Sequence, residues 1–251
     1  MSVAVRDHRV RAAAPVGMLG AGAEARRLVP VQPRTMVEQA AEAIVAGAAR
    51  GIFLPEDRLV EAEIARDLGI SRVPVREALR LLESQGIVVS TPYKGMRLMQ
   101  VTNGGVAALM RVRLSLETLA VREALARPGG PRRFDALRGA ADTFAEASHA
   151  TDPAQPVMAE QEFHAALCRA SGNAPLLALW QSLARQLAVV WGLALQLQSA
   201  ESQAEDHYAL VEALESGDEA GALAILVGHI EQFVALDLEA LVAERRRQPA
   251  G

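Results

Sequence analysis

The sequence predicts a mainly α-helical protein with two folded parts: the first ends in a small β-hairpin, and the second is an all-α antiparallel helical bundle. Three observations predict this fold class. Apolar residues recur at helical spacing over most of the chain after residue 34. Residues 87–101 alone carry short strand-like runs around a turn. Beyond them, glycine, proline and capping residues separate six longer helical patterns.

Composition limits the class of protein. The chain has 251 residues, of which 51% are hydrophobic and 22% charged, as in ordinary globular proteins. Its longest uncharged stretch, residues 186–200, is too short for a membrane helix. The single cysteine, Cys168, cannot form an internal disulfide, and the N-terminus lacks a secretory pattern. We therefore expect a cytoplasmic protein with no membrane partner.

The net charge of −4 is unevenly distributed. Residues 1–33 carry five arginines and two acidic residues, residues 34–101 carry nine basic and nine acidic residues, and residues 102–251 carry twelve basic and nineteen acidic residues. Because the acidic excess lies in the last segment, the total charge does not exclude a nucleic-acid-binding first part. Residues 1–33, rich in Ala, Gly, Pro and Arg, are predicted to be a disordered tail, either inert or a basic arm.

The folded chain is predicted to begin with three short helices. Thr35 and Glu38 have the spacing of a capping box, and the apolar stripe that follows ends near Gly51. A second helix is expected over about residues 60–68, and Ser71 can cap a third, in whose first turn Pro74 is tolerated. Two short helices joined by a tight glycine-containing turn make a helix-turn-helix.

The third helix carries arginines on one face. Val75, Leu79 and Leu82 form its inward stripe, whereas Arg72, Arg76 and Arg80 recur every four residues on another face. This is the arrangement of a recognition helix, whose guanidinium groups reach phosphates or guanine edges in the major groove. The alternative is an ordinary solvated basic face.

A hairpin is predicted after this helix, with strands at about residues 87–90 and 96–101. Lys94 and Gly95 lie in its turn and give it a basic tip, unless they form only a solvent-exposed turn. A helix-turn-helix followed by such a hairpin is a winged helix-turn-helix, which we assign to residues 34–101.

The run from Leu59 to Val88 closely resembles the DNA-binding domain of GntR-family transcriptional regulators, above all in the segment Ser-Arg-Val-Pro-Val-Arg-Glu-Ala-Leu at residues 71–79. The resemblance implies that Arg72 and Arg76 contact double-stranded operator DNA and that Gly95 approaches it closely. Ala62 replaces the arginine usual in the family, which removes one expected contact. We expect a homodimer on a palindromic operator, because two-fold protein symmetry matches two-fold operator symmetry.

Residues 102–245 are predicted to form the second domain. Its helices are expected at about residues 102–127, 132–148, 154–171, 174–199, 201–216 and 218–244. Glu160 and His164 lie one turn apart, and His207 and His229 also fall on inward stripes. Imidazoles with a carboxylate suit Zn, Ni, Fe or Mn, and bundle cores are common places for such sites. The alternative is a set of hydrogen-bonded core histidines.

This second part resembles the FCD effector domain of the FadR-like GntR subgroup, in which an Asp-x-x-x-His pair and two later histidines hold a divalent metal. The resemblance implies that Glu160, His164, His207 and His229 are the ligands, with Zn or Ni expected, although Glu160 replaces the usual aspartate. It also implies that Arg113 and Asn173 bind a small carboxylic acid effector. A salt bridge of Arg113 to Glu117 or Glu160, and helix capping by Asn173, are the alternatives.

These features predict a ligand-responsive DNA-binding transcriptional regulator and not an enzyme. A metal-dependent hydrolase is a second hypothesis, because three histidines and a carboxylate can hold a catalytic zinc. It lacks a His-Glu-x-x-His motif and leaves the N-terminal motif unexplained. A regulator with a metal-free effector pocket is a third.

Overall fold

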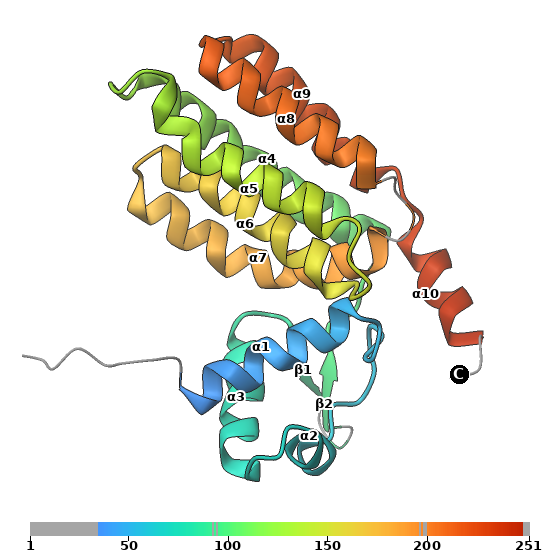
Figure 1. The fold of residues 1–251 in the computed structure, drawn as a ribbon. Helices are drawn as coiled ribbons and strands as arrows, with labels where there is room; N and C mark the ends of the chain where they lie inside the picture. Colours follow the sequence, from blue (N-terminus) through green and yellow to red (C-terminus); the bar gives the residue numbers. More distant parts are fainter. Residues whose placement is uncertain (1–34, 92, 94, 196, 198–199, 248–251) are drawn as a thin grey trace, which may run out of the picture. The chain divides into compact units, whose positions relative to one another are not determined.

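The computed structural model describes residues 35–247, except residues 92, 94, 196, 198 and 199. The predicted tail at residues 1–33 and Lys94 therefore lie outside the described residues. The order of elements begins with α1 (Met36–Ala49), α2 (Glu61–Asp67), α3 (Arg72–Ser84), β1 (Val88–Thr91) and β2 (Gly95–Leu98). Three short helices followed by a two-stranded hairpin confirm the predicted winged helix-turn-helix (Figure 1).

Local sequence signals explain the ends of α1. The Thr35 hydroxyl accepts a hydrogen bond from the backbone N–H of Glu38 at 3.2 Å, and the Glu38 carboxylate accepts the N–H of Thr35 at 2.8 Å. This is the predicted capping box, which satisfies backbone donors at the start of the helix. Gly51, with φ of +77°, follows the last turn, where a left-handed conformation favours glycine.

The helix-turn-helix pairs α2 with α3 through a left-handed glycine, Gly69, with φ of +66°. On α3, Val75, Leu79 and Leu82 are fully buried, as the apolar stripe predicts. Ser71 occupies the N-cap position, but its side chain makes no capping hydrogen bond, so that part of the prediction is wrong.

The hairpin is antiparallel, with Val88 opposite Leu98 and Thr91 opposite Gly95. Its second strand ends at Leu98, shorter than the predicted 96–101. On its other side Leu98 donates its N–H to Asp57 and accepts the N–H of Glu56, while Met99, beyond the strand, still donates its N–H to Ile87. The hairpin is thereby attached to the segment that precedes α2.

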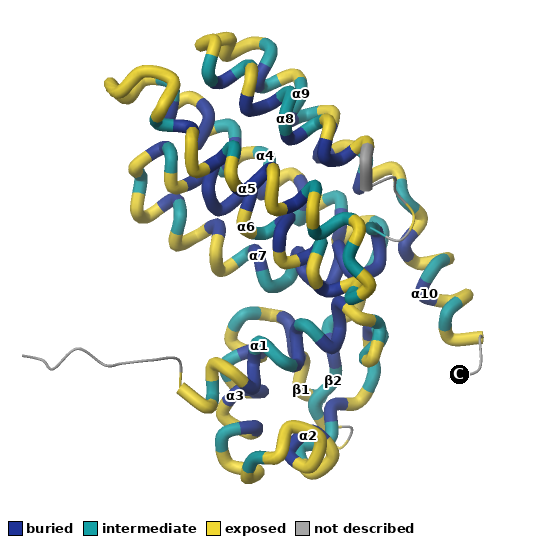
Figure 2. Tube along the Cα trace, in the orientation of Figure 1, coloured by how far each residue is buried: buried dark blue, intermediate teal, exposed yellow. Residues whose placement is uncertain are grey.

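The second part consists of helices only, within the described residues. They are α4 (Asn103–Ala126), the 3-10 turn η1 (Pro131–Phe134), α5 (Asp135–Ala147), α6 (Ala154–Ala170), α7 (Ala174–Ala194), α8 (Ala200–Ser216), α9 (Glu219–Val234) and α10 (Leu238–Arg247). Helix α4 packs against α6, α7 and α9, α5 packs against α6 and α8, and α8 packs against α9. The buried residues in Figure 2 follow the faces that these helices turn toward one another.

The final helical pattern departs from the prediction. A single helix was expected over residues 218–244, whereas the chain breaks at residues 235–237 and bends by 41° between α9 and α10. Side chains supply the hydrogen bonds at the break: Asp237 accepts the N–H of Ala240 at 3.0 Å, and Asn103 accepts that of Leu238 at 3.0 Å. These contacts start a new helix, because they satisfy its free N–H groups.

Helix α7 is long and apolar enough, by length and composition, to cross a membrane. No membrane helix was predicted, because the longest uncharged stretch, residues 186–200, is too short to span a membrane. In the structure, 56% of the residues in the relevant window are buried inside the protein. The helix packs against α1, α4 and α6, and Trp180 and Trp191 are almost fully enclosed. Its apolar character is therefore that of a core helix.

Candidate metal centre and nucleic-acid interface

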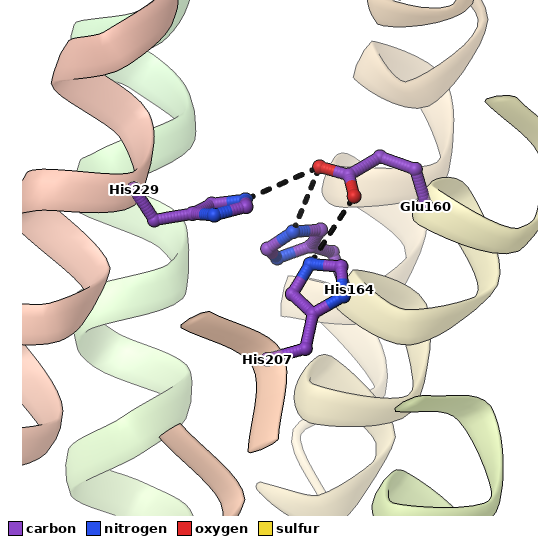
Figure 3. A group of neighbouring side chains, drawn as sticks. All are labelled: Glu160, His164, His207 and His229. Carbon is purple, nitrogen blue, oxygen red and sulfur yellow. Dashed lines mark hydrogen bonds and ion pairs between the residues drawn. The ribbon is translucent and has the colours of Figure 1, made fainter. Parts of the chain in front are cut away.

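Four side chains from three helices converge in the core of the helical part. Glu160 and His164 lie one turn apart on α6, His207 lies on α8 and His229 lies on α9. All four are buried, none with more than 3% of its surface exposed. The structure thus brings together the four residues that the sequence proposed as ligands, and Figure 3 shows them pointing toward one another.

The Glu160 carboxylate lies at the centre of this cluster. Its oxygens lie 3.2 Å from Nε2 of His164, 3.1 Å from Nε2 of His207 and 3.3 Å from Nε2 of His229. One potential ligand atom from each residue lies within 4.8 Å of all the others. The extra methylene of glutamate, compared with the expected aspartate, therefore still lets the carboxylate reach all three imidazoles.

The donor set fits a divalent cation. Three imidazole nitrogens and one carboxylate are typical ligands of Zn²⁺ and related metals. Oε2 of Glu160 and Nε2 of His207 are both deeply buried and lie 3.1 Å from each other, in ion-pair contact. Neither atom makes a hydrogen bond with the described residues. Buried polar atoms without hydrogen bonds are costly, and a cation between them would satisfy both.

Electrostatics favours metal-binding forms of Glu160 and His207 but not of His229. Burial alone would lower the pKa of His229, but its contacts with Asp206 and Glu160 outweigh burial and raise that pKa. Burial alone would raise the pKa of Glu160, but the charges of His164 and His207 outweigh burial and hold that pKa well below its usual value. Burial lowers the pKa of His207 to about 4, against the opposing charge of Glu160. Near neutral pH, Glu160 is therefore ionised and His207 neutral, which are the states that ligate metals.

Arg113, on α4, is part of the same buried group. Its Nε donates to Oε1 of Glu117 at 2.9 Å, and its Nη2 lies 3.4 Å from Oε1 of Glu160 and 2.5 Å from Nε2 of His164. The side chain is fully buried, and its Nη1 has no hydrogen-bond partner among the described residues. Arg113 thus forms the salt bridges that the sequence left open as the alternative, and it also lies beside the candidate metal ligands. Its predicted part in effector binding stays a prediction.

Asn173 lies at the start of α7. Its Oδ1 accepts the N–H of Leu176 at 3.0 Å, and its Nδ2 donates to Glu123 at 2.9 Å. These contacts are those of a helix cap, the alternative that the sequence left open. Its predicted part in effector binding is not tested by them and stays a prediction.

The arginines proposed to read DNA are exposed on α3. Arg72, Arg76 and Arg80 all lie outside the core, as the inward stripe of α3 requires. Arg76 forms a two-pronged ion pair with Glu61 of α2, with distances of 2.9–3.1 Å, and Arg80 pairs with Glu77 at 2.9 Å. Two of the three guanidinium groups are thus already held by neighbouring carboxylates.

A cationic side chain that the sequence did not predict there, Arg58, lies beside the wing. Gly95 is exposed with φ of +76°, and a Cβ atom there would lie 3.5 Å from Nε of Arg58. Arg58 pairs with Arg97 through an isolated β-bridge, which places it beside the hairpin although it precedes α2 in sequence. No helical or strand periodicity surrounds Arg58, so no sequence pattern indicated this position.

Two carboxylates beside the four candidate metal ligands were also not predicted as site residues. Glu117 lies 3.0 Å from Nδ1 of His164, and Asp206 lies 3.4 Å from Nδ1 of His229. The sequence marked Glu117 only as a salt-bridge partner of Arg113. Asp206 adjoins His207 in the chain but contacts His229 on another helix, so its role depends on how α8 packs against α9.

Comparison with known proteins identifies the two parts. The model described as "Bacterial regulatory proteins, gntR family" matches residues 36–98, and the FCD domain model matches residues 108–232. Over 200 residues the chain is 30% identical to a "Probable D-xylose utilization operon transcriptional repressor" of Paenarthrobacter nicotinovorans, which covers 80% of this chain and 88% of the relative. The chain belongs to the GntR family of bacterial transcriptional regulators. It is a GntR regulator with an FCD domain.

More distant comparisons agree with this assignment. The GntR/FCD chain is 25% identical to the transcriptional repressor GlaR of Escherichia coli, over 72% of this chain and 86% of that protein. Its fold is similar to that of E. coli McbR/YncC, with a TM-score of 0.68 at 21% identity, covering 86% of this chain and all of that one. Because the family comprises regulators and not enzymes, the hydrolase hypothesis is not retained.

Proposed function

We propose that this GntR/FCD protein is a ligand-responsive regulator, whose binding to a palindromic operator is modulated by a small organic acid at a metal-containing pocket. The observation that carries the proposal is the buried cluster of three histidines, Glu160 and Arg113 inside the FCD domain of a chain with a GntR helix-turn-helix. The domains are taken as residues 34–101 and 102–245, and the protein as cytoplasmic. The relative from P. nicotinovorans and GlaR are named as repressors, so repression is the mode to test first.

The DNA-binding half of the proposal rests on α3 and the hairpin. Arg72, Arg76 and Arg80 are exposed on α3, where they would contact phosphates or base edges in the major groove. Lys94 and Gly95 would meet the adjacent DNA as parts of the wing. A homodimer would present two such surfaces to two half-sites, which compensates for the neutral charge of residues 34–101.

The sensing half rests on the buried cluster. Glu160, His164, His207 and His229 would hold the divalent ion, with Zn or Ni expected from the nitrogen-rich donor set. When bound, the ion would supply positive charge and Lewis acidity that attract a carboxylate. Nη1 of Arg113, buried and without a hydrogen-bond partner among the described residues, is a second group that an acid could use.

A metal-free effector pocket is the second candidate. It is favoured by one observation, namely that the Arg113 guanidinium already lies within 3.4 Å of Glu160 and 2.9 Å of Glu117. Positive charge is thus present beside both buried carboxylates without a metal ion. If the purified, untagged protein contains no stoichiometric divalent ion and is not stabilised by added Zn²⁺ or Ni²⁺, this second candidate replaces the first.

Fluorescence anisotropy with the fragment upstream of the protein's own gene tests operator binding at low salt. We expect Arg76→Ala to weaken specific binding about 5- to 150-fold, because loss of a base or phosphate contact costs about 1–3 kcal/mol. Arg132→Ala is the matched control, since Arg132 is an exposed arginine in η1, outside the DNA-binding domain. If the wild type fails to bind this fragment and Arg76→Ala behaves identically, the proposed DNA-binding function is wrong.

A further inference from the structure

The outer ring nitrogens of two candidate ligands face carboxylates outside the cluster. Nδ1 of His164 lies 3.0 Å from Oε2 of Glu117, and Nδ1 of His229 lies 3.4 Å from Oδ2 of Asp206. The Nε2 atoms of the same rings face Glu160 at 3.2 and 3.3 Å. Each imidazole therefore lies between a carboxylate inside the cluster and a carboxylate behind it.

Neighbouring donors indicate where the proton of His164 resides. Nη2 of Arg113 lies 2.5 Å from Nε2 of His164. A guanidinium group can donate but cannot accept hydrogen bonds, so Nε2 is the acceptor in this contact. The ionised carboxylate of Glu160, 3.2 Å from the same Nε2, would instead need a donor there, and a cation bound between Nε2 and the carboxylate would remove that conflict. The neutral ring then carries its proton on Nδ1, the nitrogen that faces Glu117. A lone pair on Nε2 is what a metal ligand requires.

Both outer carboxylates are held in place. Oε1 of Glu117 accepts hydrogen bonds from Nε of Arg113 at 2.9 Å and from Nε1 of Trp180 at 2.8 Å, which directs Oε2 to His164. The Oε2 contact is an ion-pair contact and not a well-aligned hydrogen bond. Asp206 accepts a hydrogen bond from Nε2 of Gln232 at 2.8 Å. Their negative charge is thus held at fixed positions behind two of the three imidazoles.

We propose that Glu117 and Asp206 are positioning residues, which hold His164 and His229 with the proton on Nδ1 and with Nε2 directed toward a divalent cation. The proposal rests on the metal-binding part of the proposed function and assigns two residues to it. Carboxylates behind ligating histidines fix the ring orientation and increase ligand basicity, and their loss typically weakens metal affinity by about 10- to 100-fold.

Competition titration of Zn²⁺ against a chromophoric chelator tests this assignment in the full-length protein. We expect Asp206→Asn and Glu117→Gln each to weaken Zn²⁺ binding about 10- to 100-fold, because the amides keep the size of the side chain but lose its charge. Glu215→Gln is the control on α8, where Glu215 pairs with Arg138, and Glu123→Gln is the control on α4. Both controls should bind Zn²⁺ as the wild type does.

A spectroscopic readout separates positioning from a merely structural role. In protein labelled with ¹⁵N-histidine, NMR of the zinc-loaded wild type should show His164 and His229 with a protonated Nδ1. Asp206→Asn should disturb the signal of His229 and leave that of His164 unchanged, whereas Glu117→Gln should do the reverse. Equal Zn²⁺ affinity and unchanged histidine signals in both variants would overturn the inference.

The experiments distinguish failure of the metal-binding hypothesis from failure of the positioning roles of Glu117 and Asp206. If the wild type binds no divalent ion, the metal-binding part of the proposed function fails first, and the positioning roles fail with it. If the wild type binds Zn²⁺ and both variants bind it equally well, only the positioning roles fail. Since the Asp206 side chain is 29% exposed, Asp206→Asn keeps the test available if the fully buried Glu117 cannot be replaced without unfolding.

Discussion

At the scale of single residues, the recognition face of α3 combines arginines with nearby carboxylates. Glu61 holds Arg76 through three hydrogen bonds, and the same contact lowers the pKa of Glu61. The pair is exposed enough for solvent to screen it, so its contribution to the free energy of folding is small. We expect the pair to affect DNA binding more than stability, because Glu61 places negative charge beside the surface that would meet phosphates.

We therefore expect Glu61→Gln to raise the affinity for non-specific double-stranded DNA a few-fold at low salt, with the gain shrinking as salt is added. Glu219→Gln is the matched control, because Glu219 forms an exposed ion pair with Arg122 in the helical part. Anisotropy with an unrelated fragment, measured over a series of salt concentrations, checks the prediction. The same rise in both variants would assign the effect to net charge alone.

Some residues of the site could be predicted from the sequence, and others could not. Glu160, His164, His207 and His229 could be predicted because each interrupts the inward apolar stripe of a helix. Asn173 could be read equally as a cap or a pocket residue, because both uses need the same polar side chain beside a glycine. The roles of Glu117 and Asp206 beside the candidate ligands could not be predicted, because each contacts a histidine on another helix.

At the scale of elements, α1 and α7 pack closely against each other at Gly192. A Cβ atom on Gly192 would lie 2.5 Å from Cα and 2.8 Å from the carbonyl oxygen of Ala49. The obstacle is backbone, which cannot move aside as the end of a side chain could. The close approach of the Ala49 backbone therefore explains why a glycine occupies this position in the middle of an apolar helix.

We expect Gly192→Ala to lower the free energy of unfolding by about 1–3 kcal/mol, the usual cost of overpacking. Gly139→Ala, in the middle of α5, is the matched control, because nothing lies within 4 Å of a Cβ atom there. It should raise the free energy of unfolding by about 0.5–1 kcal/mol through helix propensity. Urea unfolding of both variants checks the pair, and stabilisation by Gly192→Ala would show that α1 and α7 are not packed in this way.

Element boundaries were predictable where the signal was local. The capping box at Thr35 and the helix end near Gly51 depend on neighbours in sequence, and both are found as predicted. The break between α9 and α10 depends on Asn103, which lies more than 130 residues from Leu238. The helical periodicity of residues 218–244 contains no trace of that contact, so a single helix was predicted there.

At the scale of the whole molecule, the uneven distribution of charge follows the division between the winged helix and the helical part. The acidic excess belongs to residues 102–251, which contain the buried cluster, whereas residues 34–101 are neutral and carry the arginines of α3. The winged helix and the helical part could both be predicted, because each follows from local periodicity and turn residues. The convergence of three helices on Glu160 could only be expected from the family resemblance, since spacing alone does not show which helices meet.

A ligand that binds only the folded protein stabilises it by mass action, by about 2.7 kcal/mol at a concentration 100 times its dissociation constant. We therefore expect added Zn²⁺ or Ni²⁺ to raise the melting temperature of chelator-treated protein by several degrees. His207→Ala should abolish this shift, because it removes one of three imidazoles from the cluster. His149→Ala, at an exposed position outside the cluster, is the control and should keep it. A similar shift in His207→Ala would place the stabilising ion elsewhere.

Native mass spectrometry of the untagged protein tests for a metal-binding homodimer in one experiment, because it reports subunit number and bound metal together. We expect a homodimer that retains one divalent ion per subunit, and a His207→Ala dimer that retains none. A wild-type protein that binds its operator but retains no stoichiometric divalent ion, even after incubation with Zn²⁺ or Ni²⁺, would contradict this prediction.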